Sequence, residues 1–231
     1  MAYRPLVIAH RGASARQSEN SLAAFRLARE LGADAVEFDV HATADGHLIV
    51  HHDEMVGRHH VAHCSFREVR EHRLTNGEQV PTLEEALAAI VPAMIAFIEI
   101  KAMPPRLDET FLAILQRSGA PLDRFAVHSF DHRIVHRIGE RKVDLRRGVL
   151  VTPDIARPLA ALNDADASDL WPQVPMIDRQ LVDAAHQAQA RVLAWTVDDP
   201  DTMRRLTDLG VDGLCTNHPD RARQVVDSLA A

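Results

Sequence analysis

Residues 33–53 read ADAVEFDVHATADGHLIVHHD and contain two short segments that are typical of β-strands. In the first segment, Ala35–Val40, side chains alternate between two faces, so Glu37 and Asp39 share one face and hydrophobic residues fill the other. The second segment, His47–His51, follows an Asp-Gly pair, which favours a tight hairpin turn. The stretch therefore predicts a strand with an acidic face, followed by a small appendage.

Short β-like runs and amphipathic helical stretches alternate along the whole chain, which indicates βαβ units and a parallel sheet. When His47–His51 is set apart as the appendage, eight strands remain, each followed by a helix. This count predicts an α/β fold, a single (β/α)8 TIM barrel, with a doubly wound open sheet as the alternative. The predicted strands are Leu6–His10, Ala35–Val40, Ile95–Lys101, Phe125–His128, Arg147–Val151, Pro175–Ile177, Val192–Val197 and Gly213–Thr216. The predicted helices are Ser21–Leu31, Leu83–Ile90, Leu107–Leu115, His132–Ile138, Ile155–Leu162, Gln180–Gln189, Thr202–Leu209 and Arg221–Leu229.

The composition is that of a globular protein with one large core. Of the 231 residues, 46% are hydrophobic and 26% are charged, and the net charge is −7. An acidic chain with 4% aromatic residues lacks the basic surface and the stacking groups of a nucleic-acid-binding protein. No linker rich in glycine, serine or proline divides the chain, which favours one domain over residues 1–231, with an insertion over about 41–82.

The hydrophobic runs predict neither export nor membrane insertion. Leu6–Ala9 is too short for a signal peptide, and Ala86–Ile98 is interrupted by Pro92 and shorter than the roughly 20 residues of a membrane-spanning helix. Cys64 and Cys215 are the two cysteines of the chain, and both are expected to be reduced thiols. We therefore expect a cytoplasmic protein, whose oligomeric state the sequence leaves open.

Reactive side chains gather where the predicted strands end, and barrel enzymes have their active sites at this end of the strands. The first strand ends in His10 and is followed by Arg11, and the appendage ends beside His52. The third strand carries Glu99 and Lys101 on one face. These residues are therefore candidates for an active site.

Three carboxylates on two neighbouring strands, Glu37, Asp39 and Glu99, would repel one another unless cations offset them. Lys101 supplies one positive charge, and a divalent cation would supply two more. Ligation by oxygen atoms alone favours Mg²⁺ or Ca²⁺ over zinc. The sequence therefore predicts a divalent cation site at the mouth of the barrel.

Eight short motifs occur in a fixed order between Leu6 and Pro219. They are His10-Arg11-Gly12-Ala13, Glu19-Asn20-Ser21, Glu37-x-Asp39, His52-Asp53, Val80-Pro81-Thr82-Leu83-Glu84-Glu85, Glu99-x-Lys101, Trp195-Thr196-Val197 and Thr216-Asn217-x-Pro219. This ordered set resembles the glycerophosphodiester phosphodiesterase family. The resemblance implies a TIM barrel with a short insertion after the second strand, in agreement with the periodicity.

The resemblance also implies an activity, the metal-dependent hydrolysis of glycerophosphodiesters to an alcohol and sn-glycerol 3-phosphate. It leaves open which histidine is the base, and whether the glycerol 2-hydroxyl or water attacks the phosphorus. Trp195, at the end of a strand, is expected to form a wall for the glycerol or alcohol part of the substrate. The implied roles are metal ligation by Glu37, Asp39 and Glu99, general acid–base catalysis by His10 and His52, and phosphate contacts by Arg11 and Lys101.

The clearest departure from the family pattern is the histidine-rich segment Arg58–Cys64. Because it follows His52 but supplies no matched residue, we expect it to influence the choice of substrate. Within it, His59 and His63 are four residues apart, but a solvated loop is favoured over a zinc site because no second ligand cluster follows. Two alternative functions are a phospholipase D-like enzyme acting on lysolipids and a non-catalytic phosphodiester-binding protein.

Overall fold

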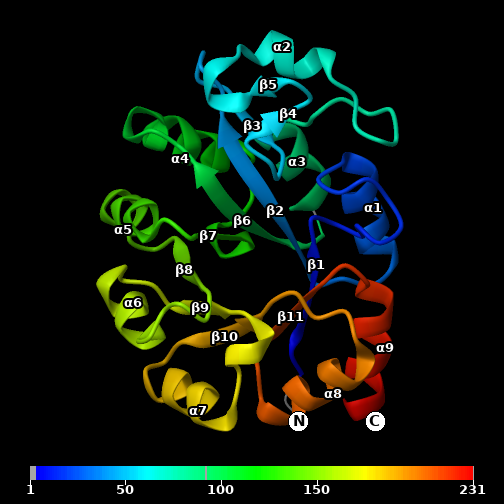
Figure 1. Ribbon diagram of the computed structural model, residues 1–231, viewed down its shortest axis with the longest axis vertical. Coiled ribbons are helices and arrows are strands. Elements are labelled where there is room, and N and C mark those ends of the chain that lie inside the picture. Colours follow the sequence, from blue (N-terminus) through cyan, green and yellow to red (C-terminus); the bar gives the residue numbers. More distant parts are fainter. Residues whose placement is uncertain (1–3, 92, 231) are drawn as a thin grey trace.

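The computed structural model describes residues 4–91 and 93–230, and within them eight parallel strands close into a barrel (Figure 1). The first strand, β1, pairs with β2 on one side and with β11 on the other, which closes the ring. The predicted (β/α)8 architecture is thus confirmed. The barrel strands are β1 (Leu6–His10), β2 (Ala35–Ala42), β6 (Ile95–Ala102), β7 (Phe125–Ser129), β8 (Arg146–Val151), β9 (Asp169–Pro172), β10 (Arg191–Ala194) and β11 (Gly213–Thr216).

Helices surround the barrel on its outside (Figure 1). Polar residues begin several of them: the Ser21 hydroxyl accepts from the Ala24 amide, and Thr82 and Glu85 form a reciprocal capping box. Buried apolar faces of these helices pack on the outward-facing strand side chains, while Ile8 and Phe97 belong to a separate cluster inside the ring. The helices are α1 (Leu22–Glu30), α3 (Leu83–Ile90), α4 (Asp108–Arg117), α5 (His132–Arg141), α6 (Pro158–Asp164), α7 (Arg179–Gln187), α8 (Pro200–Leu209) and α9 (Pro219–Ala230).

The appendage after β2 is an antiparallel strand, β3 (Leu48–Val50), as the Asp-Gly pair predicts. It pairs with the end of β2, with Val40 opposite Val50. Further small elements follow before the chain reaches α3; they are β4 (Met55–Val56), β5 (His59–His60), a 3-10 turn at Val61–His63 and α2 (Phe66–Glu71). The interpretation of 41–82 as an insertion within a single domain stays a prediction.

The sixth barrel strand lies at Asp169–Pro172, so the prediction of a strand at Pro175–Ile177 is wrong. Val174–Met176 instead forms a 3-10 turn, which suits a proline because proline has a fixed φ and no amide hydrogen. The true strand begins with aspartate and ends with proline, two residue types that are rare in strands. Its Asp169 carboxylate is fully buried and accepts two hydrogen bonds from Arg191, at 2.8 and 2.7 Å.

Among the residues that the structure describes, every helix is too short or too polar to pass through a bilayer.

Candidate active site

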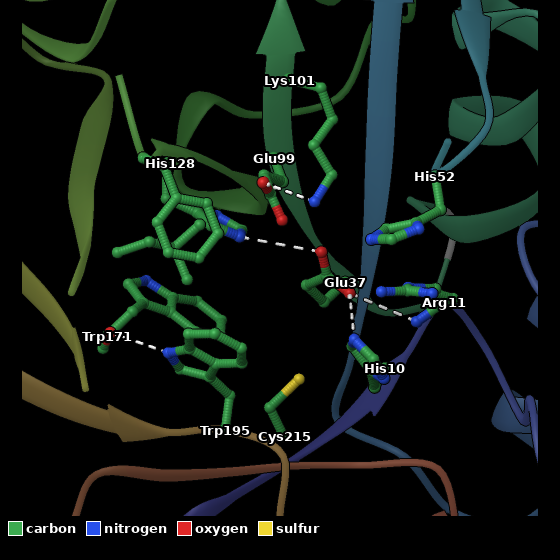
Figure 2. A pocket seen from close by; sticks show the side chains of 12 residues that line it. His10, Arg11, Glu37, His52, Glu99, Lys101, His128, Trp171, Trp195 and Cys215 are labelled. Carbon is green, nitrogen blue, oxygen red and sulfur yellow. Dashed lines mark hydrogen bonds and ion pairs between the residues drawn. The ribbon is translucent and has the colours of Figure 1, made fainter. Parts of the chain in front are cut away.

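A cavity of about 240 Å³ opens within the barrel, where the carboxyl ends of the strands meet (Figure 2). Its volume is below the roughly 300–1,000 Å³ of pockets for drug-sized molecules, so it suits a small ligand. Seven of the eight predicted site residues line it, and the eighth, Asp39, contacts two of the seven. The lining residues that carry the chemistry are His10, Arg11, Glu37, His52, Glu99, Lys101, His128 and Trp195.

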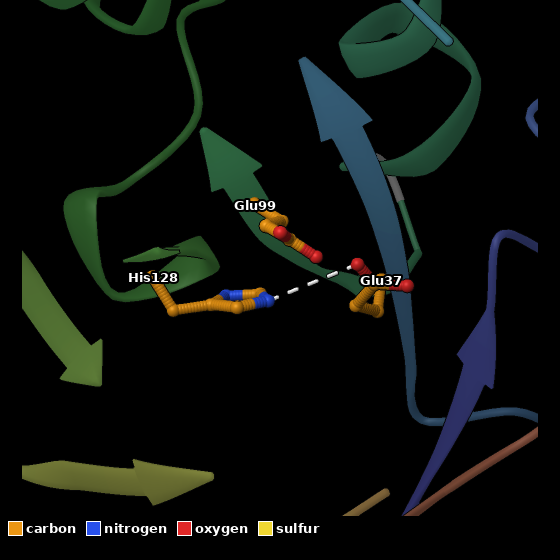
Figure 3. Close-up of side chains that lie close together, drawn as sticks. All are labelled: Glu37, Glu99 and His128. Carbon is orange, nitrogen blue, oxygen red and sulfur yellow. Dashed lines mark ion pairs between the residues drawn. The ribbon is translucent and has the colours of Figure 1, made fainter. Parts of the chain in front are cut away.

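Glu37, Glu99 and His128 form a buried group whose ligand atoms all lie within 4.8 Å of one another (Figure 3). They project from the adjacent strands β2, β6 and β7, and His128 Nε2 is 3.8 Å from Glu37 Oε1. Burial, together with the neighbouring Asp39 carboxylate, raises the pKa of Glu99 to about 8. Two buried carboxylates beside an imidazole nitrogen fit a divalent metal ion, which would offset their charges.

His128 adds a nitrogen to a site that the sequence predicted as oxygen-only. It follows the signal that identified the other candidates, because it stands near the end of a barrel strand. Its ring stacks on Trp171 with centroids 4.3 Å apart, and its Nδ1 lacks a hydrogen-bond partner among the described residues. Imidazole widens the set of suitable ions toward zinc and other transition metals.

Asp39, the third predicted ligand, is engaged with cations and lies outside that group. Its carboxylate is 3.2 Å from both Lys101 Nζ and Arg11 Nε, and it accepts a 2.7 Å hydrogen bond from Asn20 Nδ2. Burial opposes its ionisation, but Lys101 and Arg11 outweigh this effect and hold the pKa of Asp39 below its usual value. Lys101 Nζ also lies 2.7 Å from Glu99 Oε1, so both predicted phosphate-binding cations are paired with carboxylates.

The His10 ring is oriented by an amide that is itself held by a carboxylate. Asn217 Nδ2 donates to Asp198 Oδ2 at 2.6 Å, so the oxygen of the same amide faces His10 Nδ1 at 2.8 Å. An amide oxygen accepts, and therefore His10 Nδ1 carries the hydrogen. In the neutral ring Nε2 is then a free acceptor, and it lies 4.0 Å from Glu37 Oε2.

The His52 ring is oriented by its sequence neighbour. Its Nδ1 lies 2.7 Å from Asp53 Oδ1, and this hydrogen bond lowers the pKa of Asp53. The ionised carboxylate accepts this hydrogen bond, so Nδ1 of His52 also carries a hydrogen. Nε2 of His52 takes no part in the bond to Asp53. His51 instead bonds the backbone oxygen of Asp53 through its own Nδ1. The structure thus brings His10 and His52 to one cavity with the same ring nitrogen anchored in each.

An aromatic wall closes the side of the cavity opposite His52 (Figure 2). Trp195 Nε1 donates to the Trp171 backbone oxygen at 2.8 Å, and Phe130 packs edge-on against Trp195 with centroids 5.6 Å apart. The expected lining role of Trp195 agrees with this position. Sequence reasoning missed Trp171, because its strand was assigned to Pro175–Ile177.

Comparisons with known proteins agree with this geometry. Residues 10–221 match the model of the glycerophosphoryl diester phosphodiesterase family. The chain is 32% identical to a glycerophosphodiester phosphodiesterase of Caldanaerobacter subterraneus, over 94% of this chain and 96% of that protein. It is 34% identical to a probable glycerophosphodiester phosphodiesterase 2 of Mycobacterium tuberculosis, over 96% of this chain and 90% of the relative. An Oleispira antarctica phosphodiesterase, solved in complex with the product sn-glycerol-3-phosphate, superposes with a TM-score of 0.87 at 26% identity, covering 97% of this chain and 98% of that one.

Proposed function

The chain belongs to the glycerophosphoryl diester phosphodiesterase family, and we propose that it hydrolyses glycerophosphodiesters to an alcohol and sn-glycerol 3-phosphate with a divalent cation and two histidines. One observation carries this proposal: a metal-capable acidic group, two oriented histidines and two cations face a single small cavity. Each part answers one chemical demand of phosphodiester hydrolysis. We also propose that the chain acts in the cytoplasm on a small molecule, without a nucleic-acid partner.

The first demand is charge. A phosphodiester carries a negative charge that resists an oxygen nucleophile, and more negative charge develops on its oxygens as the nucleophile approaches. Glu37 and Glu99 would hold the cation, with Asp39 as the predicted third ligand and His128 as a further candidate; Mg²⁺ or Ca²⁺ suits the carboxylates. A bound divalent cation would supply positive charge toward the phosphoryl oxygens.

Arg11 and Lys101 would also offset the negative charge of the phosphoryl oxygens, in addition to the bound cation. Both lie within 3.2 Å of the Asp39 carboxylate at the edge of the cavity. Their side chains are only partly exposed, at 17% and 18%, so they are held in place before a substrate arrives. We propose that each also donates to phosphate oxygens, since Arg11 has five N–H donors and Lys101 has three, and the contact with Asp39 engages only one nitrogen of Arg11 and one direction of the Lys101 ammonium.

The second demand is proton transfer, and the partners of the two rings suggest the assignment. His10 bonds a neutral amide, so its free Nε2 is suited to accept the proton of the attacking hydroxyl. His52 bonds a carboxylate, which stabilises a ring that holds a second proton, as in other histidine–carboxylate pairs. We therefore propose His10 as the general base and His52 as the general acid that protonates the leaving alkoxide.

Product analysis tests the activity. The purified chain is incubated with glycerophosphocholine and with a lysophospholipid, with and without a chelator. We expect sn-glycerol 3-phosphate from the first substrate, and loss of that product after exhaustive dialysis against EDTA. Full activity after dialysis would refute the metal requirement, and preferential turnover of the lysophospholipid would favour the phospholipase D-like alternative.

A further inference from the structure

A second cavity, of about 570 Å³, adjoins the active site. One wall is the loop between β1 and α1, and the other is the segment 72–75 that follows α2 in the insertion. Just beyond these walls, a 3.3 Å hydrogen bond from the Ala23 amide, in the first turn of α1, to Glu78 Oε2, three residues after Thr75, connects the two parts of the chain. Of the residues that line the second cavity, His52 is the one that also lines the first.

This shared residue indicates what the second cavity holds. The aromatic wall lies on the opposite side of the first cavity, so a group that leaves the phosphorus toward the second cavity passes His52. In the proposed reaction the oxygen of the attacking hydroxyl forms a bond to phosphorus, the bond from phosphorus to the alcohol oxygen breaks, and the electron pair of the broken bond stays on the alcohol oxygen. His52 Nε2 gives the oxygen a proton, while His10 holds the proton taken from the nucleophile. The second cavity is therefore placed to hold the leaving alcohol.

The lining chemistry restricts the class of alcohol. Glu19 already pairs with Arg11 at 3.0 Å, whereas Arg73 adds a positive charge on the facing wall. No phenylalanine, tyrosine or tryptophan of the described chain lines this cavity, so it lacks the aromatic faces that bind quaternary ammonium groups. Its walls instead carry hydroxyl and imidazole groups, among them Thr75 and His72, which can both donate and accept hydrogen bonds.

We infer that the second cavity is the subsite for the leaving alcohol and that it favours a neutral polyhydroxy alcohol, such as glycerol or inositol, over a quaternary amine. The inference rests on the proposed function. The inference also assigns the choice of substrate to the segment 72–75 rather than to Arg58–Cys64, because no residue of 58–64 lines either cavity. His63 lies in the insertion outside both cavities, with its ring stacked on His60.

This arrangement gives a matched pair of variants, His72→Leu at the subsite and His63→Leu outside it. For each, kcat/KM is measured with glycerol phosphate esterified to glycerol, to inositol, to choline and to methanol. The methyl ester reports chemistry without hydroxyls in the subsite. We expect the wild-type chain to prefer the polyol esters to the choline ester. His72→Leu should lower kcat/KM for the polyol esters by about 2- to 10-fold, the value of one hydrogen bond, and leave the methyl ester unchanged.

Thr75→Val, at an exposed position, should act in the same direction as His72→Leu, and His63→Leu should change none of the four values. Normal turnover of the methyl ester shows that each variant is folded. A preference for the choline ester, or equal losses on all four esters in His72→Leu, would overturn the subsite alone. Hydrolysis of none of the esters by the wild-type chain would overturn the proposed function and the subsite with it.

Discussion

Binding of a divalent cation should release a proton from Glu99. Its pKa of about 8 leaves the carboxyl about ten-to-one protonated at pH 7, whereas a metal ligand must be ionised. We therefore expect about 0.9 proton released per metal ion at pH 7 and about 0.1 at pH 9. For the same reason, the apparent metal affinity should rise about tenfold per pH unit below pH 8 and level off above it.

Isothermal titration calorimetry at one pH, in buffers with different ionisation enthalpies, measures the released protons directly. Glu99→Gln should abolish the release, whereas Glu109→Gln, an exposed glutamate on α4, should retain it. Without metal, the contribution of Glu99 to folding stability depends on pH in the opposite direction to that of a carboxylate whose pKa is lowered by folding. The raised pKa means that the contribution of Glu99 to stability is largest below about pH 4.5 and falls as the pH rises to about 8. Metal binding without proton release at pH 7, or with an affinity independent of pH between 6 and 8, would refute this reasoning.

Three further predictions concern the residues around the metal group. His10→Ala and His52→Ala should each slow turnover by about 10²- to 10⁴-fold, and a nitrophenyl ester should partly rescue only His52→Ala, because a good leaving group needs no acid; equal rescue of both variants in steady-state assays would contradict the assignment. Asp39→Asn should weaken metal binding and leave the circular dichroism spectrum unchanged, since asparagine has nearly the same size and the side chain faces Arg11 and Lys101 at the cavity rather than the hydrophobic layer; unchanged affinity by calorimetry would remove it from the ligand set. Asn217→Leu frees His10 Nδ1 and should lower kcat about tenfold, the value of one hydrogen bond, with a changed ring tautomer by ¹⁵N NMR; an unaltered tautomer would show that the amide does not orient the ring.

The fold was largely predictable because strand and helix periods alternate so regularly in this chain. The failure at β9 has a local cause. Asp169 begins this strand as a buried anchor for Arg191, and its pairing depends on a residue 22 positions away. When strands are assigned from the hydrophobicity of each segment alone, a partner in another segment is not detected.

The candidate site was predicted less completely than the fold, for the same reason. Strand alternation correctly placed Glu37 and Asp39 on one face. It did not reveal that Asp39 would be held by Asn20 and Lys101, from two other parts of the chain, whereas His128 would approach Glu37. These choices depend on the register between neighbouring strands, with Asp39 beside Glu99 and Glu99 beside His128. That register exists only in the closed barrel.

The stacking of His128 on Trp171 should make the intrinsic tryptophan fluorescence of the protein sensitive to events in the active site. The chain contains two tryptophans, Trp171 and Trp195, and both line the active-site cavity. Its ultraviolet emission therefore originates almost entirely at the site and carries little background from elsewhere. An ion that draws His128 toward Glu37 would alter the contact of the imidazole with the Trp171 indole. Occupancy by metal or product can thus be followed as a change in intrinsic fluorescence, without a label and without turnover.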